Sequence, residues 1–274
     1  MELRQGQVAV VTGGASGIGR AMAGHFAARG LKIVIADIEA DALAGAVGEL
    51  TAAGADAIGV RTDVARVEEV EALAAAAYER FGAVDVLCNN AGVVKRGRVW
   101  EQTLADWEWV VGVDLWSVIY GARAFIPRMI AGGRPGHIVN TASTAGLAAF
   151  PLIGPYNVSK SAVVALSETL WHELHEVGAP IGVSVLCPGM VATRIGDSER
   201  NRPDAPARTA RPAPISTRNP GALVMPASVV ADQVGAAIES DQFWIVTHPE
   251  YDDFVRRRAA GILNRRDVVE PQPL

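Results

Sequence analysis

A glycine-rich turn between an apolar run and a helical pattern constrains the fold of this chain most. Residues 7–12 form a short apolar run, residues 13–19 read Gly-Gly-Ala-Ser-Gly-Ile-Gly, and the spacing of Met22, Phe26 and Ala27 predicts a helix after them. Glycines at such a turn let backbone N–H groups and the positive end of the helix dipole approach a pyrophosphate. Because glycine clusters also occur in ordinary turns, the turn alone leaves nucleotide binding open.

The next predicted strand, residues 32–37, ends in Asp37, twenty residues after Gly17. A carboxylate at this point can accept hydrogen bonds from both ribose hydroxyls and repels a 2′-phosphate, which favours NAD(H) over NADP(H). Neither position 14 nor position 38 carries an arginine or a lysine. The turn and the acid together predict a dinucleotide site.

Strand-like and helical segments alternate along the rest of the chain. Helices are expected at about 40–53, 67–81, 103–130 and 226–239, and strands at 56–60, 84–88, 137–142, 181–187 and 243–247. Near-continuous apolar strands are typical of parallel sheets covered on both faces. The 274 residues show no linker and no internal repeat. They therefore predict a single α/β domain, a doubly wound parallel sheet in three layers.

Tyr156 and Lys160 stand four residues apart at the start of another helical pattern, so the phenol and the ammonium share a face. A buried ammonium beside a phenol favours the phenolate and lowers its pKa from about 10 towards working pH. Such a phenol can exchange a proton with an alcohol or a ketone. Ser143 follows the predicted strand at 137–142 and can point its hydroxyl at the same place. Taken alone, this spacing is more often that of an exposed surface pair.

Composition excludes several other classes of function. The net charge is −5 and no long basic tract is present, so nucleic acid is not an expected partner. No signal peptide and no apolar stretch of about 18 residues is found, which predicts a cytoplasmic protein without a membrane span. Cys88 and Cys187 each end a strand-like run and are expected to be reduced core residues. His172 and His175 lack a third ligand, so no metal is expected.

Residues 194–226 are rich in proline and arginine, and we expect a substrate lid over about 190–226. Its positive charge could attract an anionic substrate, but a solvated, mobile loop is the better explanation of such a charge run. A basic helical tail is expected over about 250–274.

These motifs together resemble the short-chain dehydrogenase/reductase family over nearly the whole chain. They are residues 12–19, Asp63-Val64, Asn89-Asn90-Ala91-Gly92, Ser143, Tyr156 with Lys160, and Pro188-Gly189, in the order and spacing of that family. The resemblance implies a seven-stranded Rossmann sheet, a homotetramer or dimer, and hydride transfer to or from C4 of nicotinamide.

The resemblance also implies roles for individual residues. Tyr156 would be the acid/base, Lys160 would hold the nicotinamide ribose, Ser143 would orient the substrate oxygen and Thr193 would help to hold the carboxamide. The expected cofactor-binding set is Gly13, Ser16, Gly17, Ile18, Gly19, Asp37, Ile38, Asp63, Val64, Asn90, Ala91, Gly92, Val113, Tyr156, Lys160, Pro188, Gly189, Val191 and Thr193.

One position departs from the family. Where its members often carry Val-Asn-Leu, with the asparagine as fourth catalytic residue, this chain reads Val113-Asp114-Leu115. Asp114 can take over that role through its backbone, but its carboxylate would weaken the effect of Lys160 on Tyr156. We therefore expect an alkaline pH optimum for oxidation.

The expected substrate pocket is apolar and suits a hydrophobic secondary alcohol or its ketone. It comprises Ser143, Ala145, Leu147, Ile153, Tyr156, Met190 and Ile195. Residues 129–139 and 244–250 are similar to a bacterial branch that includes Cα-dehydrogenases of lignin-derived aryl alcohols, which extends the expectation to aromatic substrates. The alternative is an NAD(H)-binding sensor or scaffold with an idle triad, for which Asp114 is the only support. An epimerase or dehydratase is disfavoured by the glycine spacing and by the short chain.

Overall fold

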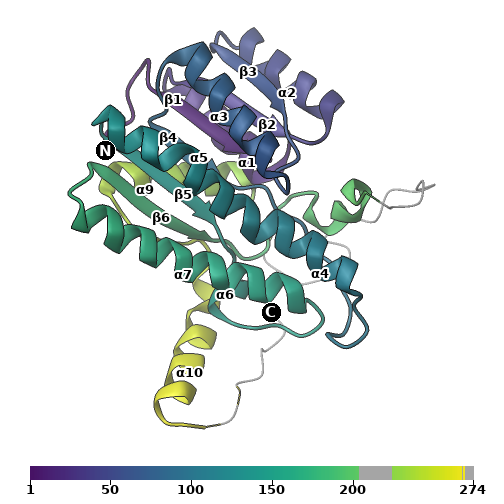
Figure 1. The fold of residues 1–274 in the computed structure, drawn as a ribbon. Coiled ribbons are helices and arrows are strands. Elements are labelled where there is room, and N and C mark those ends of the chain that lie inside the picture. The colour runs from purple at the N-terminus through teal and green to yellow at the C-terminus, as the bar shows by residue number, and fades with distance from the viewer. Residues whose placement is uncertain (204–223, 267, 269–274) are drawn as a thin grey trace.

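A computed structural model describes residues 1–203, 224–266 and 268 of the chain. Within them, seven strands form one parallel sheet in the order β3-β2-β1-β4-β5-β6-β7 (Figure 1). The strands are β1 Val8–Thr12, β2 Lys32–Asp37, β3 Ala57–Arg61, β4 Val86–Asn89, β5 Gly136–Thr141, β6 Ile181–Cys187 and β7 Trp244–Val246. The predicted doubly wound fold is confirmed, with its change of strand order between β1 and β4.

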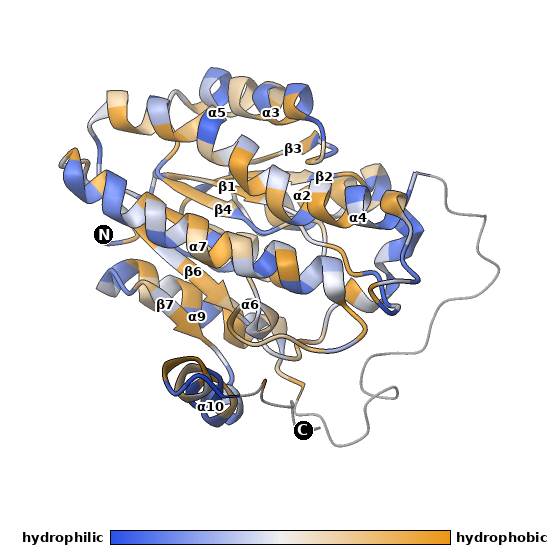
Figure 2. Cartoon of the chain, turned by 60° about the horizontal axis from the view of Figure 1, so that its bottom comes forward, coloured by the Kyte–Doolittle hydropathy of each residue, from blue (hydrophilic) through white to orange (hydrophobic). Residues whose placement is uncertain are grey.

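Helices cover both faces of this sheet. The α-helices of the described residues are α1 Gly17–Ala28, α2 Ala40–Ala52, α3 Val67–Phe81, α4 Leu104–Val111, α5 Ser117–Gly132, α6 Thr144–Leu147, α7 Gly154–Glu176, α9 Ala227–Ser240 and α10 Asp252–Leu263, of which α10 lies away from the sheet (Figure 1). Ala9 and Val11 of β1 pack in the layer that contains α1, α2 and α9, whereas Val8 and Val10 pack in the layer that contains α3, α5 and α7. Figure 2 shows the mostly hydrophobic central strands between these layers. Alternate side chains of each strand thus enter separate cores.

The helix predicted over 103–130 is interrupted. A π-helical segment, η1 Gly112–Trp116, separates α4 from α5 and contains the fully buried Asp114. Counted together with η1, the residues from α4 to α5 form one helical span, Leu104–Gly132. Among the described residues this is one span that is long and apolar enough to cross a membrane, judged by length and composition alone. Val118 and Phe125 of this span are buried in the core, so we assign it to the helical layer. Single π turns of this kind are frequent at functional sites.

The two segments expected to form the lid and the tail are described only in part. Residues 195–201 form a short 3₁₀ segment, η2 Ile195–Asn201, and Val191 bridges Met225. Residues 204–223, including Arg208, Arg211 and Arg218 of the expected lid, lie outside the described residues, as do 267 and 269–274 of the tail. Helix α10 extends from the body of the fold (Figure 1) and is anchored by Phe254, whose ring lies 5.6 Å from that of Phe150.

The remaining expectations concern side chains of the core and surface. Cys88 and Cys187 are free and buried, as predicted. His172 and His175 both contact the ring of Trp171. Across the described ranges, no group of three or more His, Cys, Asp and Glu side chains is placed to hold a metal ion.

Candidate active site

A cleft of about 1080 Å³ opens along the carboxyl ends of the strands and contains the predicted site. Its lining residues include Gly13 after β1, Asn90 after β4 and Ser143 after β5. Ligands of open α/β sheets bind where the strand order reverses, here between β1 and β4. The volume exceeds the range of about 300–1,000 Å³ typical of a pocket for one small ligand. The cleft is therefore large enough for a dinucleotide and a second small molecule.

The glycine-rich turn is shaped by close backbone approaches. Gly13 has a φ of 64°, and a Cβ on Gly19 would lie 2.3 Å from the Gly13 carbonyl oxygen. The Thr12 hydroxyl accepts hydrogen bonds from the N–H groups of Asn90 and Ala91 at 2.9 and 3.1 Å, which joins this turn to the loop after β4. Side chains at these two glycines would clash with the loop after β4 and with the turn itself, so glycine is what allows the turn to pack this closely.

Asp37 is oriented by the backbone around it. Its Oδ2 accepts from the Ala15 N–H and its Oδ1 from the Glu39 N–H, both at 3.1 Å. Burial raises the pKa of Asp37, and these two hydrogen bonds oppose that shift. The carboxylate lines the cleft beside the glycine-rich turn, the position expected of a group that binds a ribose.

Nearly all of the predicted cofactor residues line this one cleft. Gly19 is the exception, since it is buried beneath the turn where it allows close packing. The lining members are Gly13, Ser16, Gly17, Ile18, Asp37, Ile38, Asp63, Val64, Asn90, Ala91, Gly92, Val113, Tyr156, Lys160, Pro188, Gly189, Val191 and Thr193.

Ser143, Tyr156 and Lys160 meet in the middle of the cleft. The Ser143 hydroxyl caps α6 by accepting from the Ala145 N–H at 3.1 Å and donates to the Pro188 carbonyl at 3.4 Å, and it lies close enough to Tyr156 to lower the pKa of the phenol. Lys160 is 2% exposed, donates to the Thr141 carbonyl at 3.0 Å and has its Nζ 5.5 Å from the centre of the Tyr156 ring. The strand end and the first turns of α7 thus bring the three groups together as predicted.

The predicted lowering of the Tyr156 pKa does not arise from the protein groups present. Burial raises the pKa of Tyr156, the Asp114 carboxylate raises it further, and the Ser143 hydroxyl acts in the opposite direction. The sequence-based expectation was wrong on this point because it counted the ammonium of Lys160 without the cost of burying a phenolate.

The π-helical segment η1 places the carboxyl group of Asp114 beside the ammonium group of Lys160. Asp114 Oδ1 accepts from the Val93 N–H at 2.7 Å, and Oδ2 lies 3.6 Å from Lys160 Nζ. Oδ2 is buried and has no hydrogen-bond partner. Burial raises the pKa of Asp114 to about 6, against the opposing effects of Lys160 and of the Val93 N–H. Its carboxyl group therefore changes charge close to neutral pH.

The substrate end of the cleft differs from the prediction at one residue. Ala145, Ile153, Met190 and Ile195 line the cleft, but Leu147 does not, because it packs against the core of Val118, Val163 and their neighbours. Phe150, which belongs to the apolar stretch expected between Ala145 and Ile153, also lines the cleft, whereas several other lining residues were missed, namely Glu39, Arg96, Trp109, Glu250 and Tyr251. Tyr251 lies in the segment after β7, and no motif around it in the sequence indicates that it contacts the cleft.

His248 fixes the turn after β6 by hydrogen bonds with the backbone of Gly189 and of Met190. Its Nδ1 accepts from the Gly189 N–H at 3.1 Å, so Nε2 carries the proton and donates to the Met190 carbonyl at 3.0 Å. The ring is fully buried. A side chain near the end of the sheet thus positions a wall of the cleft that the sequence motif Pro188-Gly189 only marks.

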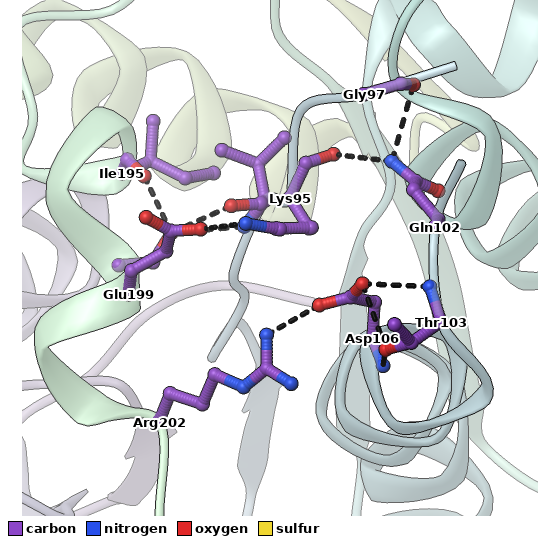
Figure 3. Close-up of polar contacts among 10 residues, drawn as sticks. Lys95, Gly97, Gln102, Thr103, Asp106, Ile195, Glu199 and Arg202 are labelled. Atoms are coloured by element: carbon purple, nitrogen blue, oxygen red, sulfur yellow. Dashed lines mark hydrogen bonds and ion pairs between the residues drawn. The ribbon is translucent and has the colours of Figure 1, made fainter. Parts of the chain in front are cut away.

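Segment η2 is tied to the opposite wall of the cleft by charged and polar contacts (Figure 3). Glu199 pairs with Lys95, and the Ser198 hydroxyl accepts from the Val94 N–H at 2.9 Å. Arg202 pairs with Asp106, whose carboxylate also completes the N-terminal cap of α4 with Thr103. The prediction of a solvated basic loop is therefore wrong for the described part of the lid.

A Rossmann sheet with a glycine-rich turn at its change of strand order and a Tyr156–Lys160 pair in the same cleft is typical of dinucleotide-dependent oxidoreductases. The family model described as short chain dehydrogenase matches residues 7–204, and the chain belongs to this family.

Individual relatives agree with this assignment. A short chain dehydrogenase/reductase from Burkholderia phymatum, solved in complex with NAD, is 45% identical, with 100% of both chains covered and a TM-score of 0.92. The 1-deoxy-11-beta-hydroxypentalenate dehydrogenase of Streptomyces avermitilis is 40% identical over 250 residues, which cover 90% of this chain and 86% of the relative. The C alpha-dehydrogenase of a Sphingobium species is 34% identical over 277 residues, covering 98% and 89%. The chain is thus an oxidoreductase related to dehydrogenases of hydroxylated compounds.

Proposed function

We propose that this protein interconverts a hydrophobic secondary alcohol and its ketone with NAD(H), using Tyr156 as acid/base. The observation that carries this proposal is the convergence of Ser143, Tyr156 and Lys160 in a cleft that also contains the dinucleotide cradle. A sensor with an idle triad would have no need for this arrangement.

The side chains suggest a division of work in the reaction. NAD⁺ would supply the hydride acceptor, held between the glycine turn and Asp37. Ser143 and Tyr156 would hold the substrate oxygen between their hydroxyls, and Tyr156 would take the hydroxyl proton during oxidation or return it during reduction. Lys160, buried beside the phenol, would hold the nicotinamide ribose, and its ammonium would act against the increase in the Tyr156 pKa that burial causes.

Asp37 supports NAD(H) as the cofactor. Its carboxylate is held by two backbone N–H groups and points into the cleft, where it would accept from ribose hydroxyls and repel a 2′-phosphate. The relative solved with NAD, at 45% identity, supports the same choice.

The substrate end supports an apolar alcohol. Ala145, Phe150, Ile153 and Met190 contribute apolar surface to the cleft, and a site of this kind gains affinity from the apolar area that a ligand buries. The names of the two dehydrogenase relatives, which act on a hydroxylated pentalenate and at a Cα position, agree with a hydroxyl on a carbon skeleton as the reacting group.

A panel of alcohols with NAD⁺, followed by the absorbance of the reduced nicotinamide, tests the proposed substrate class. We expect turnover of hydrophobic and aromatic secondary alcohols, with little turnover of polyols. Activity confined to polyols would contradict the proposed pocket. Tight NAD⁺ binding without turnover of any alcohol would favour the sensor instead.

The substitution Asp114→Asn is expected to move the pH dependence of oxidation. Because burial raises the pKa of Asp114 to about 6, its carboxylate is charged above that pH and raises the pKa of Tyr156. Oxidation by the wild type should therefore rise on the alkaline side, and the variant should show the same rise at lower pH. The measurement is kcat/KM for an alcohol between about pH 5 and 10, a range that runs from below the raised pKa of Asp114, about 6, up to the ordinary pKa of a tyrosine, about 10. An unchanged profile in the variant would show that Asp114 does not act on Tyr156.

We also propose a homodimer or homotetramer. Trp116 at the α4–α5 junction is 47% exposed and Trp244 on β7 is 39% exposed, and large apolar side chains of this kind are enriched at subunit contacts. A monomer mass in solution would contradict this proposal.

A further inference from the structure

The Glu39 carboxylate occupies a site built from donors of segment η2. Arg200 donates to Glu39 Oε1 from Nε at 3.0 Å and from Nη2 at 2.6 Å. Asn201 Nδ2 donates to the same oxygen at 3.2 Å, and Arg194 Nη1 lies 3.5 Å from Oε2. Two guanidinium groups and one amide thus converge on a single anionic group.

Arg200 is held in place independently of Glu39. Its Nη1 donates to the carbonyl oxygens of Arg194 at 3.2 Å and of Asp197 at 2.9 Å. The side chain of Arg200 is only 18% exposed. The Nε–Nη2 edge therefore keeps its direction towards the cleft when the carboxylate is removed.

This anion site lies beside the residue that discriminates between the two nicotinamide cofactors. Glu39 follows Asp37 by two residues and donates its N–H to Asp37 Oδ1 at 3.1 Å. Asp37, Glu39, Arg194, Arg200 and Asn201 all line the same cleft. The fork of a guanidinium group that binds a carboxylate also matches a phosphate, so the site has the chemistry of a 2′-phosphate pocket.

We propose that Glu39 is a second determinant of cofactor specificity, because it fills an anion site that would otherwise receive the 2′-phosphate of NADP(H). The inference rests on the proposed function, since it assumes that a nicotinamide dinucleotide lies with its adenosine end at Asp37. Asp37 repels the phosphate, and Glu39 occupies the donors that would bind it. Both carboxylates must then be removed before the arginines can bind a 2′-phosphate.

The test compares adenosine 5′-monophosphate with adenosine 2′,5′-bisphosphate, which differ only by the 2′-phosphate. Binding is measured by calorimetry on the full-length wild type, Asp37→Ser, Glu39→Ala and the double variant. Each single substitution should tighten binding of the bisphosphate by no more than about tenfold, because one carboxylate still blocks the site. The double variant should tighten it by about 10³-fold, more than the product of the two single effects, since the two residues are coupled. Binding of the monophosphate should change far less.

Glu199→Ala, combined with Asp37→Ser, is the matched control. It removes one negative charge from η2, but Glu199 pairs with Lys95 and not with the arginines beside Asp37. The control should bind the bisphosphate no more tightly than Asp37→Ser alone does. A comparable gain in the control would overturn the proposal in favour of a general charge effect.

Two further outcomes separate the hypotheses. A double variant that binds the bisphosphate no more tightly than Asp37→Ser would contradict the role of Glu39. If thermal melting shows that Glu39→Ala disturbs the fold, Glu39→Gln replaces it, because glutamine keeps the size of the side chain and removes its charge. Combined with Asp37→Ser, this variant should also bind the bisphosphate more tightly, by a smaller factor. A wild type that binds neither the monophosphate nor NAD⁺ would instead contradict the proposed function itself.

Discussion

Replacing Tyr156 by phenylalanine is expected to lower kcat for alcohol oxidation by at least about 10²- to 10⁴-fold, the usual contribution of a positioned acid–base group. The phenol is the group that both Ser143 and Lys160 approach in the cleft, and phenylalanine preserves the ring but cannot carry the proton. Binding of NAD⁺ should remain close to that of the wild type, since the glycine turn and Asp37 are untouched. Stopped-flow kinetics and a separate NAD⁺ titration measure both quantities.

Tyr78→Phe is a suitable control for this comparison. The Tyr78 hydroxyl is buried without a hydrogen-bond partner on α3, and Tyr78 is not among the residues that line the cleft. Its loss should leave kcat unchanged. If Tyr156→Phe retained more than about a tenth of the wild-type kcat, proton transfer by Tyr156 would be ruled out as the main catalytic contribution.

Lys160→Met is expected to abolish measurable oxidation and to destabilise the fold by about 3–5 kcal/mol, the usual cost of leaving one member of a buried ion pair without its partner. Lys160 is 2% exposed and Asp114 is fully buried, with Lys160 Nζ 3.6 Å from Asp114 Oδ2. The loss should depend on pH. The pKa of Asp114 is already raised to about 6 in the folded protein, and removal of the ammonium raises it further.

The direction of this pH dependence follows from linkage. A carboxyl group with a raised pKa in the folded state costs stability once it ionises. The deficit of Lys160→Met relative to the wild type should therefore be small below about pH 6, where Asp114 carries little charge in either folded protein, and should grow from there up to the higher folded-state pKa of the variant, above which it levels off. Urea unfolding at several pH values measures it.

The double variant Lys160→Met/Asp114→Asn separates charge from packing in this comparison. It removes the unpaired carboxylate and should recover most of the stability without recovering activity. Equal destabilisation in the single and double variants, at every pH, would show that packing and not charge sets the cost.

The sequence predicts those parts of the site that depend on neighbours in the chain. The glycine-rich turn at 13–19, Asp37 at the end of a strand, and the four-residue spacing of Tyr156 and Lys160 each have a local physical reason, and the structure brings the turn, through Gly13 and Gly17, together with Asp37, Tyr156 and Lys160 in one cleft. Ser143 was also predictable, because the carboxyl ends of parallel strands meet at one edge of a sheet. The alternation of strand and helix predicts the parallel sheet, whereas the order of its strands is known only from the structure.

The residues that were missed depend on contacts between distant segments. Glu39 meets Arg200 across 161 positions of sequence, and neither residue carries a local pattern that indicates its partner. Tyr251 reaches the cleft only because the segment after β7 folds back over Gly189, where a Cβ would lie 2.7 Å from the Tyr251 ring. Leu147 was assigned to the pocket because it is apolar, but the short helix α6 points its side chain towards the core. The raised pKa of Tyr156 likewise depends on burial, which spacing does not report.

Transfer of deuterium from the carbinol carbon of a labelled hydrophobic secondary alcohol to NAD⁺ tests the central claim most directly. The protein is mixed with NAD⁺ and the labelled alcohol, and the reduced cofactor is analysed by mass spectrometry. A single deuterium in the NADH produced by the wild type, with no labelled NADH from Tyr156→Phe on the same timescale, is the predicted result. Tight binding of NAD⁺ with no label in the cofactor, for any alcohol of the panel, would contradict a hydride-transferring enzyme built around Tyr156 and Lys160.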